Sequence, residues 1–203
     1  MAVRNLLFDL GGVIMDIDRD RCVSAFLSLG MKDADEMLGL YAQSDVFADL
    51  ESGKISVGKF HDELRKHISG QATDQQIDEA FTQFLVGIPV ERLTMLRELR
   101  KRFRIYVLSN TNPIMWYGPI AESFRVEGLE REDYFDGIVT SFEAGCMKPA
   151  PEIFRYAQKH LGILPEETIF FDDSVKNCEV AESLGFGARH VKQGDFCKEL
   201  SKI

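Results

Sequence analysis

The chain has 203 residues, of which 45% are apolar and 28% are charged, and its formal net charge at pH 7 is −9. The length and composition are ordinary for a soluble globular protein with one sizeable domain, or one domain with a smaller insert. The negative charge disfavours nucleic acid and anionic membrane surfaces as partners, because both require a basic surface.

Membrane and disulfide classes are also disfavoured. No stretch is long and apolar enough to span a membrane, and Asp9 interrupts the only early apolar run, so we expect no signal peptide. The four cysteines form no C-x-x-C pair and no zinc-binding spacing. They are Cys22, Cys146, Cys178 and Cys197. We therefore expect free thiols and a cytoplasmic location.

Five short apolar runs are predicted to be buried parallel strands. They cover residues 5–9, 105–109, 137–141, 168–172 and 188–191. Helical patterns lie between them, at residues 94–103, 151–162 and 174–185. Strands that alternate with helices predict an α/β fold with a doubly wound, Rossmann-like parallel sheet that is covered on both faces.

Residues 17–89 interrupt this alternation, because their patterns are helical throughout. Gly, Asp, Ser and Thr separate four amphipathic helices, which are predicted at residues 20–30, 33–43, 56–70 and 73–87. We interpret residues 17–89 as a helical domain inserted after the first strand. The α/β core domain would then consist of residues 1–16 and 90–203.

Polar side chains follow four of the predicted strands. Asp9 ends the first strand, Ser109 and Asn110 end the second, Lys148 follows the third, and the pair Asp172 and Asp173 ends the fourth. In a doubly wound sheet, sites form at the carboxyl ends of the strands. We therefore expect these side chains to lie together at one edge of the sheet.

Such a cluster would suit Mg²⁺ and a phosphate group. Three neighbouring carboxylates repel each other unless a cation joins them, and Mg²⁺ prefers oxygen ligands. Ser109 and the backbone amides around Asn110 can donate hydrogen bonds to phosphate oxygens, and Lys148 adds positive charge. Gly11 and Gly12 allow close approach of the backbone to a ligand. An ionised Asp9 could attack phosphorus.

These four segments resemble the motifs of the haloacid dehalogenase (HAD) superfamily, which is dominated by Mg²⁺-dependent phosphatases. "FDLGGVIMDID" resembles motif I, "VLSNTN" motif II, "MKPAPEIF" motif III and "FFDDSVKN" motif IV. The insert resembles the helical-bundle cap of one subgroup. Within that subgroup, the chain resembles bacterial proteins with a DLGNV-type motif I, which include an α-D-glucose-1-phosphate phosphatase.

The resemblance implies a role for each motif residue. Asp9 would be the nucleophile and a metal ligand, and Gly11 would offer its backbone carbonyl to Mg²⁺. Ser109 and Asn110 would hold the phosphoryl group, while Lys148 would neutralise it and Asp9. Of the motif IV pair, Asp173 would bind the metal directly, and Asp172 would bind through water or orient the metal's waters.

One expected residue is missing. Most phosphatases of this family have a second Asp two positions after the nucleophile, as general acid and base, whereas this chain has Gly11. The substrate could have a good leaving group, such as a sugar 1-phosphate or an acyl phosphate. Alternatively, Asp16 or Asp18 could supply the acid, although solvated loop residues are the plainer interpretation of both.

The sequence thus predicts a Mg²⁺-dependent phosphatase that acts on a small phosphorylated metabolite through an aspartyl-phosphate on Asp9. A sugar phosphate such as glucose 1-phosphate is one candidate substrate. The alternatives are a 2-haloacid dehalogenase-type hydrolase, which the Asp172–Asp173 pair disfavours, and a non-catalytic protein that binds phosphometabolites, which Gly11 favours. Asn177 could support Asp172 or Asp173, and the four histidines are expected away from the motifs.

Overall fold

The structure is a computed structural model that describes residues 2–39 and 45–201. At its centre lies a parallel five-stranded sheet in the order β5-β4-β1-β6-β7. The strands are β1 (Asn5–Phe8), β4 (Arg104–Ser109), β5 (Gly137–Thr140), β6 (Thr168–Asp172) and β7 (Gly187–His190). The predicted doubly wound sheet and its five strands are confirmed, and β1 occupies the middle position.

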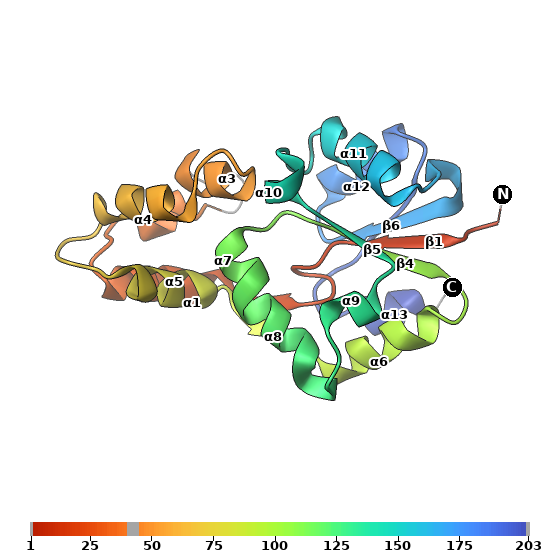
Figure 1. Ribbon diagram of the computed structural model, residues 1–203, viewed down its shortest axis with the longest axis horizontal. Helices are drawn as coiled ribbons and strands as arrows, with labels where there is room; N and C mark the ends of the chain where they lie inside the picture. The colour runs from red at the N-terminus through yellow and green to blue at the C-terminus, as the bar shows by residue number, and fades with distance from the viewer. Residues whose placement is uncertain (1, 40–44, 202–203) are drawn as a thin grey trace.

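Helices cover both faces of the sheet, as Figure 1 shows. One face carries α10 (Ser141–Ala144), α11 (Pro151–Leu161) and α12 (Val175–Ser183), and the other carries α6 (Val90–Leu99), α9 (Arg131–Tyr134) and α13 (Phe196–Leu200). The alternation of side chains along β1 explains both layers: Leu7 packs with Phe154 on the first face, while Leu6 and Phe8 pack with Phe196 on the second. A short turn, η3 (Pro165–Glu167), leads into β6.

Helix ends in the core follow local rules. Pro151 is the first residue of α11, and Gly162 ends it in a left-handed conformation. Ser174 caps α12 by accepting a hydrogen bond from the backbone N–H of Asn177. The helix predicted at residues 94–103 instead spans Val90–Leu99, because Pro89 starts the helix earlier than the apolar pattern does.

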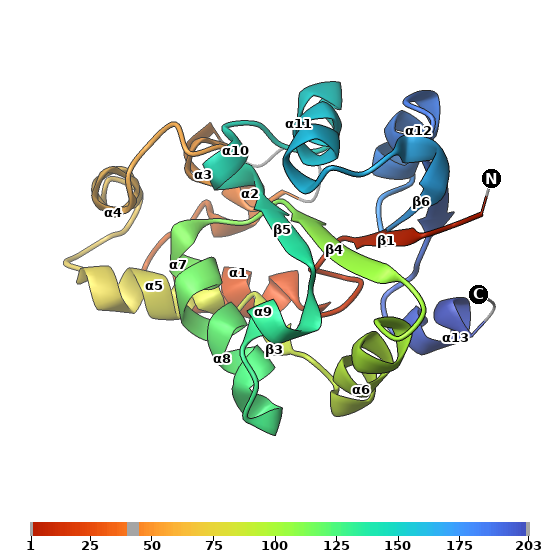
Figure 2. The ribbon, with the colours of Figure 1, turned by 45° about the vertical axis from the view of Figure 1, so that its right-hand side comes forward.

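Among the described residues between β2 and β3, five helices form a bundle beside the sheet, which Figure 2 shows from a second side. They are α1 (Arg19–Ser28), α2 (Ala34–Met37), α3 (Asp45–Glu51), α4 (Val57–Arg65) and α5 (Asp74–Thr82). Aromatic rings fill the middle of this helical bundle: the Phe47 ring centroid lies 5.2 Å from that of Phe81, 5.3 Å from that of Phe60 and 6.2 Å from that of Phe26.

The helical prediction for this region was partly wrong. The helix predicted at residues 33–43 is helical only over Ala34–Met37, and residues 40–43 lie outside the described residues. Helix α3 was not predicted. At residues 85–87 the predicted helix is replaced by β3 (Leu85–Gly87), which pairs antiparallel with β2 (Asp16–Ile17). This two-stranded ribbon joins the helical bundle to the sheet.

The segment between β4 and β5 carries a run of short helical turns that the apolar pattern did not predict. It contains α7 (Pro113–Met115), the wide turn η1 (Trp116–Ile120), α8 (Ala121–Phe124) and the tight turn η2 (Arg125–Glu127). Trp116 is buried there, with the Arg131 guanidinium 4.2 Å from its ring centroid. Within the described residues, no helix is long and apolar enough to cross a membrane.

Candidate active site

Three carboxylates meet where the central strands end. Asp9 directly follows β1, Asp172 is the last residue of β6, and Asp173 comes next. Because β1 and β6 are paired neighbours, their carboxyl ends lie side by side. One oxygen from each carboxylate lies within 4.8 Å of the others. The structure therefore brings together the acids that the sequence predicted as metal ligands.

Lys148 joins two of these acids. Its Nζ lies 2.8 Å from Asp9 Oδ1 and 2.7 Å from Asp172 Oδ2, and its side chain is 1% exposed. Burial alone would lower the pKa of this ammonium, but the carboxylates of Asp172 and Asp9 outweigh burial and raise the pKa. Lys148 is therefore protonated at neutral pH and offsets part of the negative charge.

Asp172 is held by several protein donors. The backbone N–H of Ser174 and the Asn177 side-chain amide donate to its Oδ1, at 2.8 and 2.9 Å, and Lys148 donates to its Oδ2. The sequence analysis offered Asn177 as a support for Asp172 or Asp173, and in the structure its amide contacts Asp172. Because Asp172 is fully buried while Asp173 lies at the exposed side of the cluster, Asp173 is the more accessible of the two to an ion.

The electrostatics of the cluster favour a cation. Burial raises the pKa of Asp9 to about 7, Lys148 opposes this shift, and the charges of Asp172 and Asp173 add to it. Burial and Asp172 also raise the pKa of Asp173. One ammonium thus does not balance three nearby carboxylates. A small divalent cation fits this donor set of carboxylate oxygens and would favour the ionised form of both acids.

Gly11 and Gly12 follow Asp9 and Leu10, and only one of these two positions requires a glycine. Gly12 has φ +75°, and a Cβ at this position would overlap the carboxylate of Asp173. A side chain at position 12 would therefore push away one of the three acids. At Gly11 a Cβ would meet only Ile17, at an ordinary 3.5 Å. Position 11 has room for a side chain that the chain does not supply.

Ser109 is the last residue of β4 and Asn110 follows it, and because β4 pairs with β1 both lie at the same edge of the sheet as Asp9. Ser109 is 2% exposed, and its Oγ lies 3.3 Å from the carbonyl oxygen of Asn110. The Asn110 side chain makes two hydrogen bonds with the backbone of Lys148: its Nδ2 donates to the carbonyl and its Oδ1 accepts from the N–H, both at 2.9 Å. Asn110 therefore fixes the backbone that carries the buried ammonium.

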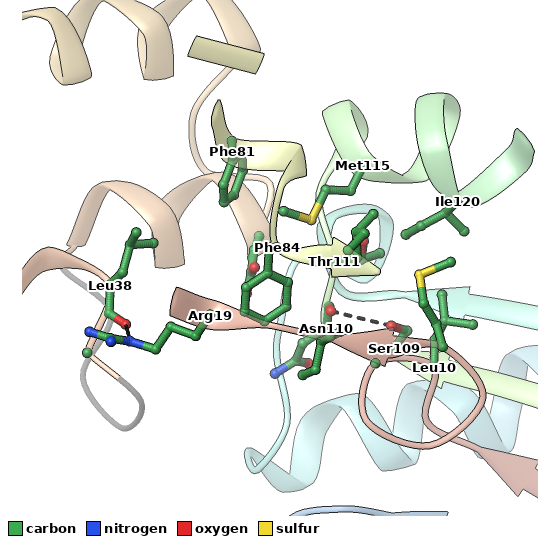
Figure 3. Close-up of a pocket in the computed structure, with 16 residues that line it drawn as sticks. Leu10, Arg19, Leu38, Phe81, Phe84, Ser109, Asn110, Thr111, Met115 and Ile120 are labelled. Atoms are coloured by element: carbon green, nitrogen blue, oxygen red, sulfur yellow. Dashed lines mark hydrogen bonds between the residues drawn. The ribbon is translucent and has the colours of Figure 1, made fainter. Parts of the chain in front are cut away.

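A cavity of about 130 Å³ lies between this edge of the sheet and the helical bundle. Figure 3 shows that both parts contribute: Ser109, Asn110 and Leu10 come from the ends of β4 and β1 and the loops after them, while Phe84, Phe81 and Leu38 come from the bundle side. The lining is mostly apolar. Arg19 also lines the cavity, and its guanidinium is bound to the Leu38 carbonyl at 2.6 Å and to Asp35 Oδ1 at 2.7 Å.

Neither of the two aspartates offered as replacement acids lines this cavity. Asp16 Oδ1 lies 2.8 Å from Nη2 of the buried Arg92, whose Nη1 also donates to the Ile14 carbonyl. Asp18 caps α1 by accepting from the backbone N–H of Asp20 and that of Arg21. Both carboxylates thus have structural partners.

Two features of the site were missed. His190 was expected away from the motifs, but its Nε2 lies 2.9 Å from the carbonyl oxygen of Asp173. Its position on β7, the neighbour of β6, could have suggested this contact. Glu51 at the end of α3 lines the same cavity as Gly11 and Ser109. The sequence offers no signal for that contact, because it depends on how the helical bundle packs against the sheet.

Comparisons with known proteins agree with this geometry. The family model of haloacid dehalogenase-like hydrolases matches residues 3–185. A D-ribitol-5-phosphate phosphatase of Bacteroides thetaiotaomicron is 38% identical over 202 residues, which are 99% of this chain and 98% of that protein.

Solved structures resemble this chain over nearly its whole length. A HAD family enzyme of B. thetaiotaomicron, in complex with magnesium and inorganic phosphate, has a TM-score of 0.92 and 38% identity, covering 98% of this chain and 99% of that one. The L-2-haloacid dehalogenase of Xanthobacter autotrophicus has a TM-score of 0.64 and covers 98% of this chain and 83% of its own. At 17% identity, this second likeness shows the fold alone.

Proposed function

The chain belongs to the haloacid dehalogenase-like hydrolases, and we propose that it is a Mg²⁺-dependent phosphatase that acts on a small phosphorylated metabolite through an aspartyl-phosphate on Asp9. The observation that carries this proposal is the cluster of Asp9, Asp172 and Asp173, with Lys148 bound to two of them. A relative that is 38% identical over nearly the whole chain carries the name of a phosphatase, which supports the same reaction.

The metal would be held by Asp9, Asp173 and the backbone carbonyl of Gly11, with Asp172 in a supporting position. Asp173 is the direct ligand in this proposal because Asp172 already accepts hydrogen bonds from Ser174, Asn177 and Lys148. When bound, Mg²⁺ offsets the charge of the phosphoryl group and keeps the nearby carboxylates ionised.

The reaction divides into two transfers. A carboxylate oxygen of Asp9 forms a bond to phosphorus while the bond between phosphorus and the leaving oxygen breaks, and that oxygen takes up a proton. Water then attacks the same phosphorus, gives up a proton, and releases inorganic phosphate and the Asp9 carboxylate. Lys148 stabilises the negative charge of the transferring group, and Ser109, next to β1 on β4, is available to donate to its oxygens.

Substrate choice would depend on the helical bundle. We propose that residues 17–89 form a cap domain over the α/β core of residues 1–16 and 90–203. Support comes from the cavity between them, where Phe81 and Phe84 face the sheet residues. A cap of this kind would exclude water and contact the part of the substrate beyond the phosphate. Sugar and polyol phosphates, including ribitol 5-phosphate and glucose 1-phosphate, are the first substrates to test.

The test is phosphate release from a panel of phosphorylated metabolites, for the wild type and for Asp9→Asn, with Mg²⁺ or with EDTA. The proposal expects release that requires Mg²⁺ and is lost in the variant. Activity on 2-haloacids that survives EDTA would support a dehalogenase instead. Binding of phosphorylated compounds without release from any of them would support the non-catalytic alternative.

A further inference from the structure

We propose that Glu51, in the last turn of α3, is a catalytic residue: it supplies the proton transfer for which position 11 has no side chain. It would protonate the leaving oxygen in the first transfer and deprotonate the attacking water in the second. This inference rests on the proposed phosphatase function and names a further participant in that reaction.

The first observation is the cavity that Leu10 and Gly11 line, directly after the nucleophile Asp9 in the chain. Gly11, Ser109 and Glu51 all line it, although they come from the loop after β1, the end of β4 and the helical bundle. Among the sixteen described residues that line the cavity, Glu51 alone carries a carboxylate, and none is a histidine. Glu51 is therefore the general acid or base that this cavity offers to a substrate bound at Asp9.

One close contact holds the end of α3 against the core domain, and hydrogen bonds hold the core segment that makes this contact. Gly53 has φ +69°, and a Cβ there would overlap the backbone carbonyl oxygen of Phe142 in α10. Helix α10 is in turn tied to the edge of the sheet, because Ser141 Oγ donates to the Thr111 carbonyl at 3.1 Å and accepts from the Thr111 N–H at 3.0 Å. Glu51 is thus two residues from a tight contact with a segment bonded to the loop after β4.

The turn after Glu51 is also internally ordered. Ser52 is 7% exposed, and its Oγ donates to the Ala48 carbonyl at 2.7 Å. The backbone N–H of Lys54 donates to the Asp49 carbonyl at 2.8 Å. A proton-transfer group must be held at a fixed position to be effective, and these bonds hold the backbone on both sides of Glu51.

The structure disfavours the two acids nearer in sequence. Asp16 pairs with the buried Arg92, and Asp18 caps α1. Glu51 comes from a distant segment but opens onto the cavity. A side chain from the bundle would thus provide the proton transfer for which position 11 has no side chain.

Proton transfers balance in this scheme. Glu51 starts protonated and gives its proton to the leaving oxygen as the bond to phosphorus breaks, which leaves Glu51 as a carboxylate. The carboxylate then accepts a proton from the water that attacks the aspartyl-phosphate, and phosphate is released. Glu51 is protonated again at the end of the cycle.

The test is rapid-mixing kinetics of Glu51→Gln with Mg²⁺ on two substrates. Glycerol 2-phosphate has an alkoxide leaving group that needs a proton, whereas p-nitrophenyl phosphate has a leaving group that does not. We expect the first turnover of glycerol 2-phosphate to fall by about 10²–10⁴-fold. With p-nitrophenyl phosphate we expect a rapid burst of nitrophenolate followed by slow turnover, because water attack lacks its base.

Two further variants keep the result interpretable. Asp49→Asn, on the same helix, removes a carboxylate that pairs with Lys54 outside the cavity and should behave as the wild type. Gly11→Asp in the Glu51→Gln background should restore much of the glycerol 2-phosphate rate, because position 11 has room for a side chain. A double variant no faster than Glu51→Gln would count against proton transfer by Glu51.

The outcomes separate this inference from the proposed function. A wild type that releases phosphate from neither substrate overturns both. An active wild type with Glu51→Gln unchanged on both substrates overturns the role of Glu51 and leaves the phosphatase in place. An equal loss in the first turnover of both substrates indicates a structural role and also overturns the inference.

Discussion

Asp9 and Phe47 are both almost fully buried, at 9% and 0% exposure, but for opposite reasons. Phe47 lies among aromatic rings in the helical bundle, where burial stabilises the fold. Burial of Asp9 raises its pKa to about 7 and disfavours its charged form. The edge of the sheet keeps an unfavourable set of charges together, whereas the bundle buries apolar surface.

This difference explains why the sequence indicates the function of the sheet edge but not that of the helical bundle. The chemistry of the sheet edge requires particular atoms at particular strand ends, so few residue types can occupy those positions. The interior of the bundle requires apolar volume, which many side chains supply equally well. The sequence of the sheet edge therefore indicates a reaction, while the sequence of the bundle indicates only a packed apolar interior.

The largest expected effect is a loss of stability when a side chain of the helical bundle is removed. Replacing Phe47 by Ala removes a ring that contacts Phe26, Phe60 and Phe81, and we expect unfolding to become easier by about 3–5 kcal/mol. Urea denaturation measures this. Mg²⁺ affinity of the folded variant should stay within about twofold of the wild type, because distant sites act independently. A large loss of Mg²⁺ affinity would remove the distinction between the two regions.

The next largest expected effect is a loss of reaction rate when a side chain at the sheet edge is changed. Lys148→Met removes the ammonium that lies 2.8 Å from Asp9 Oδ1, and we expect the rate of phosphate release to fall by about 10²–10³-fold. The exposed Lys159 on α11 provides the control, since Lys159→Met should leave the rate unchanged. A Lys148→Met rate close to that of the wild type would show that the ammonium does not act on the phosphoryl group.

A smaller effect, on metal affinity, is expected from Asn177, which contacts Asp172. Asn177→Ala removes the amide that donates to Asp172 Oδ1 at 2.9 Å. Supporting contacts of this kind typically change metal affinity by about 10–100-fold. Isothermal titration with Mg²⁺ measures the loss. The exposed Ser183→Ala change on the same helix should have no effect, and equal affinities for all three proteins would exclude a supporting role for Asn177.

The smallest effect is a pH dependence. In the metal-free protein the pKa of Asp9 is raised from 3.8 to about 7, so its contribution to stability is present at low pH and is lost as the pH rises through 7. Mg²⁺ competes with this proton, and its affinity should fall about tenfold per pH unit below 7. Titrations on either side of that pH measure the slope. In Asp9→Asn the slope should become shallower, and an unchanged slope would assign the proton to another group.

The sequence predicted the sheet edge well because its signals are local. Apolar runs that end in Asp9, Ser109 and Asp172 indicate strands whose carboxyl ends must meet once the sheet is parallel, and the structure brings these residues together. Pro151 and Ser174 likewise mark helix starts through local geometry.

Features that depend on distant contacts were not predictable. Helix α3 lies next to residues outside the described part, and its place depends on Gly53 packing against Phe142. The β2–β3 ribbon needs residues 16–17 and 85–87 to meet across the whole bundle. The Asn110 side chain turns toward the Lys148 backbone, in a segment 38 positions away, while its expected contact with phosphate stays a prediction.

The central claim is that Asp9 carries the phosphoryl group, and trapping the intermediate tests it most directly. The wild type would be mixed with Mg²⁺ and a phosphorylated substrate that it turns over, quenched in acid, and treated with borohydride, which reduces an acyl phosphate to an alcohol. Peptide mass spectrometry should then find homoserine at position 9 and an unchanged Asp172 and Asp173. Phosphate release without modification of Asp9, or with modification of another residue, would contradict the account.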